Sequence, residues 1–133
     1  MVRSIRSGKR GFTLIELMIV MAIISILVAV AVPLYQRSVI RAKEAVLRQN
    51  LFSMRTVLDE YTYDKAKAPQ SLQDLVTEGY LRQIPMDPIT GTSDWTTIQE
   101  DAITSVNQTE PGIFDVRSKS DKKSLEGSAY NEW

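Results

Sequence analysis

The stretch GFTLIELMIVMAIISILVAVAVP, residues 11–33, decides how the chain is organised. Residues 17–32 are apolar apart from Ser25, and with the residues before them they are long enough to cross a bilayer as a helix. Such a helix needs about 20 mostly apolar residues. Glu16 is the exception, because a charged carboxyl inside an apolar span costs roughly 2.5–3.5 kcal/mol on insertion scales. A carboxylate at this position therefore needs a cation as a partner.

The apolar run itself contains no Lys or Arg, so the cation must come from elsewhere. A short basic leader precedes Gly11, and a cut after Gly11 would give Phe12 a new α-amino group, which is cationic near neutral pH. Within one helix this amine lies four residues from Glu16, at the end where the helix dipole favours an anion. Between helices staggered along an assembly, Glu16 of one subunit can meet the Phe12 amine of the next. The arrangement predicts a lock between subunits.

The hexapeptide GFTLIE, residues 11–16, closely resembles the N-terminal signature of type IV pilins and type II secretion pseudopilins. The resemblance implies that a membrane aspartyl peptidase cuts after Gly11 and methylates Phe12, and that Glu16 is the assembly glutamate. Pro33 matches a proline at which the family's helix opens, so a helix kink is expected there. The alternatives are an uncleaved signal anchor and a secretory signal peptide. A secretory signal has a shorter apolar core that ends in small residues, and a plain signal does not require Glu16.

Composition narrows the classes of function. The chain has 16 basic and 16 acidic residues, and removing residues 1–11 deletes four basic and no acidic ones, which leaves 12 against 16, a formal net charge of −4. A mildly acidic protein is a poor candidate for nonspecific nucleic-acid binding, so no nucleic acid is expected as a partner. The sequence has no Cys and no His, which excludes thiol catalysis, His-based triads and ordinary zinc sites. An exported domain of this composition also has no disulfides.

The chain is expected to have four segments. Residues 1–11 are a leader that is removed, 12–34 a transmembrane and filament-core helix, 35–65 the periplasmic half of the same helix, and 66–133 a small α+β head. The positive-inside count is close to a tie, but a short leader and a long following domain favour a cytoplasmic N-terminus. The expected location is therefore the bacterial inner membrane, crossed once, with the C-terminal domain in the periplasm.

An apolar stripe marks the second half of the long helix, which is predicted from about Thr13 to about Lys65. Its members lie three and four residues apart, as on one face of a helix: Leu47, Leu51, Met54, Leu58 and Tyr61, with Ile40 one heptad earlier. The charged residues are assigned to the other faces: Arg41, Lys43, Glu44, Arg48, Arg55 and Asp59. The stripe predicts a spine on which the head packs. The alternative is a coiled-coil dimer, although the repeat is short and lacks regular flanking charges.

The head is predicted to contain one short helix and a small antiparallel sheet. The pattern SLQD, residues 71–74, resembles a capping box and opens a helix that reaches Glu78 and is closed by Gly79. Expected strands are 95–99, 103–106 and 113–117. In the last of these, Phe114 and Val116 are expected to face one side while Asp115 and Arg117 face the other. The expected fold class is α+β and pilin-like, with the sheet packed on the helix stripe.

The head extends the resemblance. Residues 79–88, GYLRQIPMDP, and residues 114–118, FDVRS, are similar to segments of the major type II secretion pseudopilin, as are Asp121 and the final NEW, residues 131–133. The departures are residues 89–91, where a Trp-Gly pair is common, and a longer connection over residues 100–112.

The resemblance implies a structural subunit of a periplasmic pseudopilus that helps to extrude folded proteins across the outer membrane. The partners that it implies are further copies and other pilins or pseudopilins, a prepilin peptidase and methyltransferase, and an inner-membrane assembly platform. The alternative is a type IV pilus subunit used for adhesion, twitching motility or DNA uptake. No enzyme is expected, because the head carboxylates form no recognisable catalytic pair: Asp87, Asp94, Asp101 and Asp121.

Calcium is the one cofactor expected. A head of about 70 residues rarely buries enough apolar surface to be stable alone, so it usually needs an added link such as a disulfide or a bound metal ion. The resembled pseudopilins hold Ca²⁺ in the C-terminal loop through aspartates and backbone carbonyls, which suit its preference for oxygen ligands. Asp121 matches a family ligand and Glu126 is the best second carboxylate. Further oxygens are available in the loop from Ser118, Ser120 and Ser124. Against this site stand the neighbouring Lys119, Lys122 and Lys123, and the absence of the paired acids usual near the C-terminus.

Overall fold

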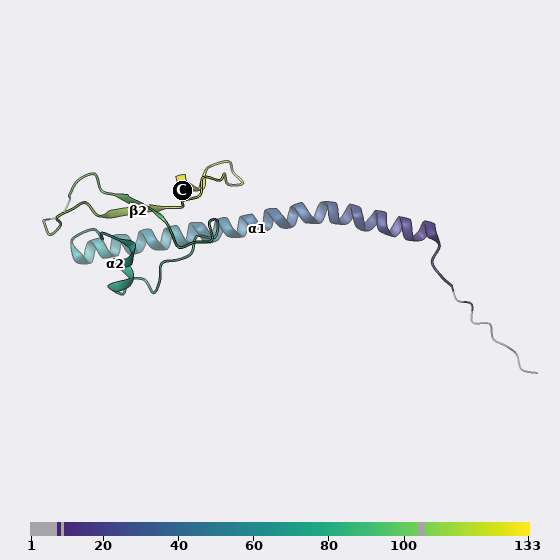
Figure 1. Cartoon of the computed structure of the whole chain (residues 1–133), viewed down its shortest axis with the longest axis horizontal. Helices are drawn as coiled ribbons and strands as arrows, with labels where there is room; N and C mark the ends of the chain where they lie inside the picture. The colour runs from purple at the N-terminus through teal and green to yellow at the C-terminus, as the bar shows by residue number, and fades with distance from the viewer. Residues whose placement is uncertain (1–7, 9, 104–105) are drawn as a thin grey trace, which may run out of the picture. The chain divides into compact units, whose positions relative to one another are not determined.

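A computed structural model describes residues 8, 10–103 and 106–133. The chain divides into two compact units, Met1–Arg37 and Ser38–Trp133. Helix α1, Leu14–Lys65, contributes to both units, and its bounds lie within one residue of the predicted helix. The other elements belong to the second unit: helix α2, Leu72–Thr77, strand β1, Thr96–Gln99, strand β2, Ile113–Arg117, and the 3₁₀ helix η1, Tyr130–Glu132 (Figure 1). The fold is α+β and pilin-like, as the sequence predicts.

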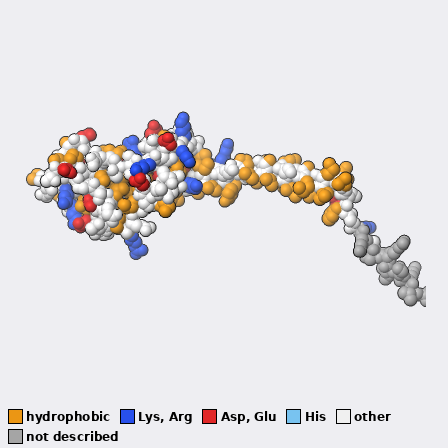
Figure 2. Space-filling model, viewed as in Figure 1, with side chains coloured by type: hydrophobic (Ala, Val, Ile, Leu, Met, Phe, Trp, Pro, Cys, Tyr) orange, Lys and Arg blue, Asp and Glu red, His pale blue; other side chains and the backbone are white. Residues whose placement is uncertain are grey.

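The first unit contains the apolar part of α1. Among the described residues, one helix is long and apolar enough to cross a membrane. It lies near the N-terminus, and the side chains of its most apolar window are not buried. Large apolar side chains cover this stretch of α1 on the visible face (Figure 2).

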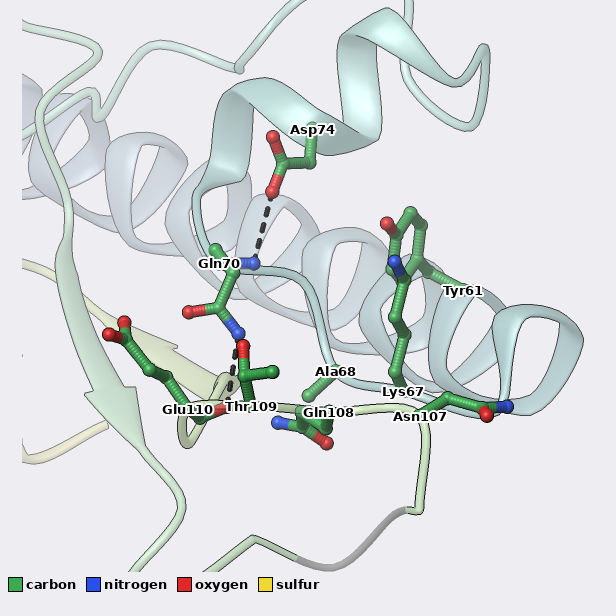
Figure 3. Close-up of a pocket in the computed structure, with 9 residues that line it drawn as sticks. All are labelled: Tyr61, Lys67, Ala68, Gln70, Asp74, Asn107, Gln108, Thr109 and Glu110. Atoms are coloured by element: carbon green, nitrogen blue, oxygen red, sulfur yellow. Dashed lines mark hydrogen bonds between the residues drawn. The ribbon is translucent and has the colours of Figure 1, made fainter.

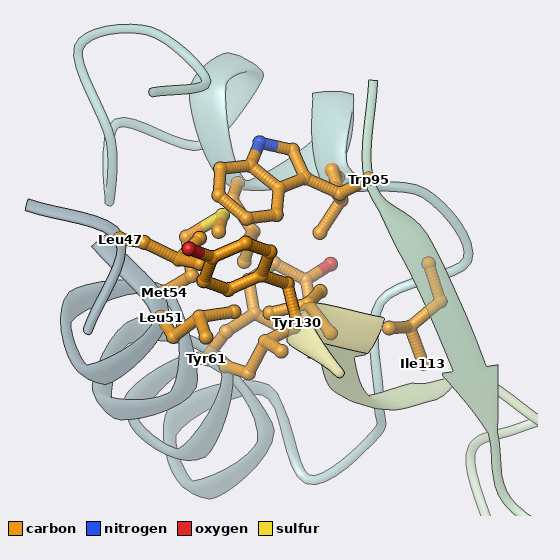
Figure 4. Packing of buried hydrophobic residues seen from close by; sticks show 11 residues of the cluster. Leu47, Leu51, Met54, Tyr61, Trp95, Ile113 and Tyr130 are labelled. Carbon is orange, nitrogen blue, oxygen red and sulfur yellow. The ribbon is translucent and has the colours of Figure 1, made fainter. Parts of the chain in front are cut away.

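The second unit is built on the predicted stripe of α1. Leu47, Leu51, Met54, Leu58 and Tyr61 are all at most 5% exposed, which confirms that part of the prediction. They pack with residues from α2, the sheet and the C-terminal segment (Figure 4): Leu72, Leu75, Trp95, Ile113, Val116 and Tyr130.

Two assignments on α1 are wrong. Ile40, predicted to extend the stripe, is 37% exposed, and Glu44, assigned to a solvent face, is 8% exposed. Spacing accounts for Glu44 only, because it precedes Leu47 by three residues and continues the alternation of threes and fours along the same face. The buried face of α1 thus begins at Glu44, and Ile40 lies beyond it.

Helix α2 begins and ends as predicted. Asp74 Oδ2 accepts hydrogen bonds from the Ser71 and Gln70 backbone N–H groups, both at 3.0 Å, which is the carboxylate half of a capping box. Glu78 is the C-cap, and Gly79 follows with φ +83°, the left-handed conformation that glycine adopts without a Cβ clash. The backbone therefore leaves α2 in the direction that the sequence indicates.

The sheet has two antiparallel strands, β1 and β2, and β2 has the predicted bounds. The predicted faces of β2 are wrong, because Val116 is buried while Phe114 is 51% exposed. Ile98 pairs with Asp115 and Gln99 pairs with Ile113, so the register skips Phe114. Such a β-bulge breaks the two-residue alternation and lets Ile113 and Val116 both face the core.

The predicted strand at 103–106 is not seen in the described residues. Its two middle residues lie outside them, and Ile103 and Val106 are exposed and belong to no strand. This segment belongs to the long connection between β1 and β2. A short apolar pattern without a packing surface does not make a strand.

Candidate assembly and processing site

The N-terminal turn of α1 is organised by Thr13. Its hydroxyl oxygen accepts the Glu16 backbone N–H at 3.2 Å, and its carbonyl accepts the Leu17 N–H at 3.1 Å. Thr13 is thus the N-cap, a role that the spacing Thr-x-x-Glu signals and that the sequence reasoning above did not use. The cap fixes the helix start directly after Phe12 and Thr13.

This start gives Glu16 and Phe12 the positions that the assembly hypothesis needs. Glu16 lies in the first turn of α1, where the unpaired N–H groups and the helix dipole favour a carboxylate. Phe12 precedes the helix and is 86% exposed. Among the ion pairs of the described residues, none involves Glu16. Cleavage at Gly11, methylation of Phe12 and the lock through Glu16 stay predictions, because each concerns another molecule.

The span satisfies its one internal hydroxyl locally. Ser25 Oγ donates to the Met21 carbonyl at 2.7 Å, one turn earlier on α1. A hydroxyl bound in this way presents no unpaired donor to lipid or to a neighbouring helix. Pro33 lies inside α1, which is assigned as helix on both sides of it, and the predicted kink stays a prediction.

Charged residues on the second half of α1 hold the C-terminal segment of the head. Arg55 Nε donates to Asp115 Oδ1 at 2.6 Å, while its Nη2 donates to the main-chain oxygens of Val116 at 3.1 Å and Trp133 at 2.6 Å. The guanidinium group of Arg48 lies 4.4 Å from the ring centre of Trp133. One face of the helix therefore binds a strand and the last residues of the chain through planar, multidentate cations.

The Asp-Pro turn is the second organising point of the head. Asp87 is fully buried, and its Oδ1 accepts the Ile89 N–H at 2.8 Å and the Thr90 N–H at 3.4 Å. Ser118 Oγ donates to the other carboxylate oxygen of Asp87. A carboxylate with several donors can stay buried, so Asp87 ties this turn to the segment after β2.

The carboxylates considered for catalysis do not form a site. Asp87 holds its turn, Asp94 forms an ion pair with Lys119 at 2.6 Å, and Asp101 and Asp121 are exposed. A polar pocket of about 180 Å³ lies elsewhere, between the end of α1, the start of α2 and residues 107–110 (Figure 3). Two of its residues, Asp74 and Gln70, serve the helix cap and a bond to the Glu110 carbonyl. Its side chains do not include a nucleophile paired with a base.

The residues considered for calcium have other partners or face solvent. Asp121 is exposed, and Glu126 forms a 3.6 Å ion pair with Arg48. The hydroxyls of Ser118 and Ser124 are engaged with Asp87 and Ser128. Within the described residues no group of three or more acidic side chains is placed to hold a metal ion. Calcium binding, with Asp121 and Glu126 as ligands, stays a prediction.

Comparison with known proteins agrees with this organisation. Residues 6–32 match the family model described as the prokaryotic N-terminal methylation motif. The chain is 31% identical to type II secretion system core protein G of Klebsiella michiganensis, and the match covers 62% of this chain and 70% of that protein. It is 33% identical to type II secretion system core protein G of Pseudomonas aeruginosa, with the same two shares.

A second group of relatives matches a smaller share. The chain is 43% identical to type IV major fimbrial protein FimA of Dichelobacter nodosus over 65 residues, which cover 49% of this chain and 41% of that protein. No solved structure matches the chain significantly. The secretion proteins match a share of the chain larger than residues 1–65 can supply, so the likeness includes part of the head. The chain belongs to the family of type II secretion system core protein G.

Proposed function

We propose that the chain is a structural subunit of the periplasmic pseudopilus of type II protein secretion. It polymerises through the first half of α1 and helps to extrude folded proteins across the outer membrane. The observation that carries the proposal is the match to type II secretion core proteins over 62% of the chain, which reaches beyond α1 into the head.

Membrane insertion and processing precede assembly in this proposal. The methylation motif covers residues 6–32 and so includes both Gly11 and the apolar span. We infer that the chain inserts in the inner membrane with its head in the periplasm, is cut after Gly11 and is methylated at Phe12. A prepilin peptidase and methyltransferase and an inner-membrane assembly platform are the partners of these steps.

Polymerisation is supported by the exposed span. Its large apolar side chains have exposures from 44% at Val20 to 77% at Leu14 in the part of the chain that the structure describes. Lipid covers such side chains in the membrane, and helices of further copies or of other pseudopilins cover them in a filament. Glu16, at the head of the span, then pairs with the Phe12 amine of a neighbouring copy. A subunit of this kind needs no catalytic residues, and we propose no enzymatic activity.

The second candidate is a subunit of a type IV pilus. It is favoured by the higher identity, 43%, to a major fimbrial protein. That match covers only 41% of the fimbrial protein, so it carries less of the argument than the matches to secretion proteins.

The test is to complement a strain that lacks the chain with the parent sequence or with Glu16→Ala. The parent is expected to restore release of folded proteins to the medium, whereas Glu16→Ala is expected to insert in the membrane but to leave those proteins in the periplasm. Glu16→Ala removes a charge that opposes insertion, so membrane extraction of this variant is the matched control. If the strain that lacks the chain secretes proteins normally but has lost its surface fibres, the proposal of a pseudopilus subunit is wrong and that of a pilus subunit takes its place.

A further inference from the structure

Glu44 is a buried carboxylate that forms no ion pair with any residue the structure describes. Its side chain lies at the start of the buried face of α1. Instead Glu44 Oε1 accepts two neutral donors, the Leu125 backbone N–H at 2.9 Å and the Tyr130 hydroxyl at 2.8 Å. Hydrogen bonds to a charged acceptor are about twice as strong as neutral ones, and they offset the cost of burying the charge.

Both donors come from the C-terminal loop, residues 118–130. The Tyr130 ring is buried in the core (Figure 4). It lies edge-on to the Trp133 ring, with ring centres 5.1 Å apart. The Tyr130 N–H donates to the Lys122 carbonyl at 3.0 Å, which closes the loop on itself. Glu44 therefore links helix α1 to two points of this closed loop, which lie 81 and 86 positions later in the sequence.

The oxygens of this loop do not fit a calcium ion. The backbone carbonyls of Lys122, Ser124 and Ser128 already accept N–H donors from within the loop or from η1. Of the two acidic residues in the loop, Glu126 pairs with Arg48. The remaining one, Asp121, is followed directly by Lys122 and Lys123, and Lys119 forms an ion pair with Asp94. Calcium takes six to eight oxygen ligands and needs carboxylate charge to offset its own.

We propose that Glu44 anchors the C-terminal loop through Leu125 and Tyr130, and that the head therefore keeps this loop folded without calcium. An anchor of this kind has the effect expected of a bound ion, since it fixes loop backbone to the helix, but it is encoded in α1. The proposal does not depend on which filament the chain enters.

The experiment measures hydrogen exchange of the Leu125 amide in the mature chain, residues 12–133, in detergent micelles. The parent is expected to exchange at the same rate in excess calcium and in chelator. Glu44→Ala is expected to speed exchange at Leu125 at least about tenfold, the factor for about 1.4 kcal/mol, and calcium is expected not to slow it. Glu60→Ala, which removes an exposed carboxylate from the same helix, and Asp121→Ala are the matched controls and are expected to change nothing.

Three results would overturn the proposal. The first is faster exchange of the parent in chelator, and the second is an effect of Asp121→Ala equal to that of Glu44→Ala. The third concerns Glu44→Leu, which nearly preserves the side-chain volume, has no oxygen to accept the Leu125 N–H, and carries the test if Glu44→Ala does not fold. If exchange at Leu125 is unchanged in Glu44→Leu, Glu44 is not the anchor.

Discussion

The two halves of helix α1 use apolar residues in opposite ways. In residues 14–34 the large apolar side chains are between 44% and 77% exposed, whereas the stripe from Leu47 to Tyr61 is at most 5% exposed. The first half is apolar on every face, and the second is apolar on one. Where apolar residues recur with the helical period, the chain's own head buries them. Where they cover every face of the helix, only lipid or other copies of the helix can bury them.

The largest expected effect concerns the cut after Gly11, which prepares the first half of α1 for assembly. Gly11→Val is expected to block the cut completely, so that intact mass finds a chain that still carries Met1–Gly11. Gly8→Val, a change in the leader outside the hexapeptide at residues 11–16, is the control and is expected to be processed. If Gly11→Val chains begin at Phe12, the cleavage position is wrong.

The next effect compares the two halves directly. Leu58→Ala is expected to lower the free energy of unfolding of the head by about 2–5 kcal/mol, because Leu58 is 1% exposed and its loss leaves a cavity. Leu27→Ala, at a position 63% exposed in the span, is expected to leave that value unchanged. Denaturant unfolding of the mature chain in micelles, followed by fluorescence of the buried Trp95, measures both. If both substitutions lowered the free energy of unfolding equally, the two halves of α1 would not differ in the way described.

The contrast also explains how much the sequence predicts. The bounds of α1 and β2 and the caps of α2 follow from local signals: a sustained period, a short apolar run, Ser71 with Asp74, and Gly79. The candidate site is local too, since Gly11, Phe12 and Glu16 lie within six consecutive residues. Such features need no knowledge of what packs on them.

The errors all concern long-range packing. The bulge at Phe114 depends on pairing with β1, and no alternation within β2 reveals it. The burial of Glu44 depends on donors more than 80 positions away, although its place on the stripe was a usable signal. Arg55, which joins three partners in the head, has no local signal at all.

A pH titration tests the contribution of Tyr130, in the C-terminal loop of the head, to stability. Burial, followed by the hydrogen bond to Glu44, raises the pKa of Tyr130 from 10.0 to about 12. Because the folded state holds the proton more tightly, this contribution is complete below pH 10 and is lost as the pH rises from 10 to 12. The difference of about two pKa units corresponds to about 2–3 kcal/mol.

Tyr130→Phe isolates that contribution, since the pKa values of Tyr61 and Tyr80 are also raised, in each case chiefly by burial. The parent is expected to lose stability more steeply than Tyr130→Phe between pH 10 and 12, measured by the same fluorescence assay. Parallel slopes would contradict the assignment.

The smallest effect probes packing where no pattern predicts it. A Cβ at Gly112 would lie 2.5 Å from Ala68 Cβ and 2.7 Å from the Ala68 carbonyl oxygen. Gly112→Ala is therefore expected to lower the free energy of unfolding by about 1–3 kcal/mol, by displacing the residue before β2 from the segment between α1 and α2. Thr97→Ala, on an exposed position of β1, is the control. An unchanged unfolding midpoint for Gly112→Ala would show that the two segments separate easily.

The three bonds of Arg55 set an order of events for the nascent chain. Its partners lie 60, 61 and 78 positions further along, and those of Glu44 lie 81 and 86. Contacts of such sequence separation form slowly and only after the distant residues are present. The links that tie the C-terminal segment of the head to α1 can therefore form only after residues 115–133 are present, whereas the packing of α2 on α1 needs no residue beyond Leu75.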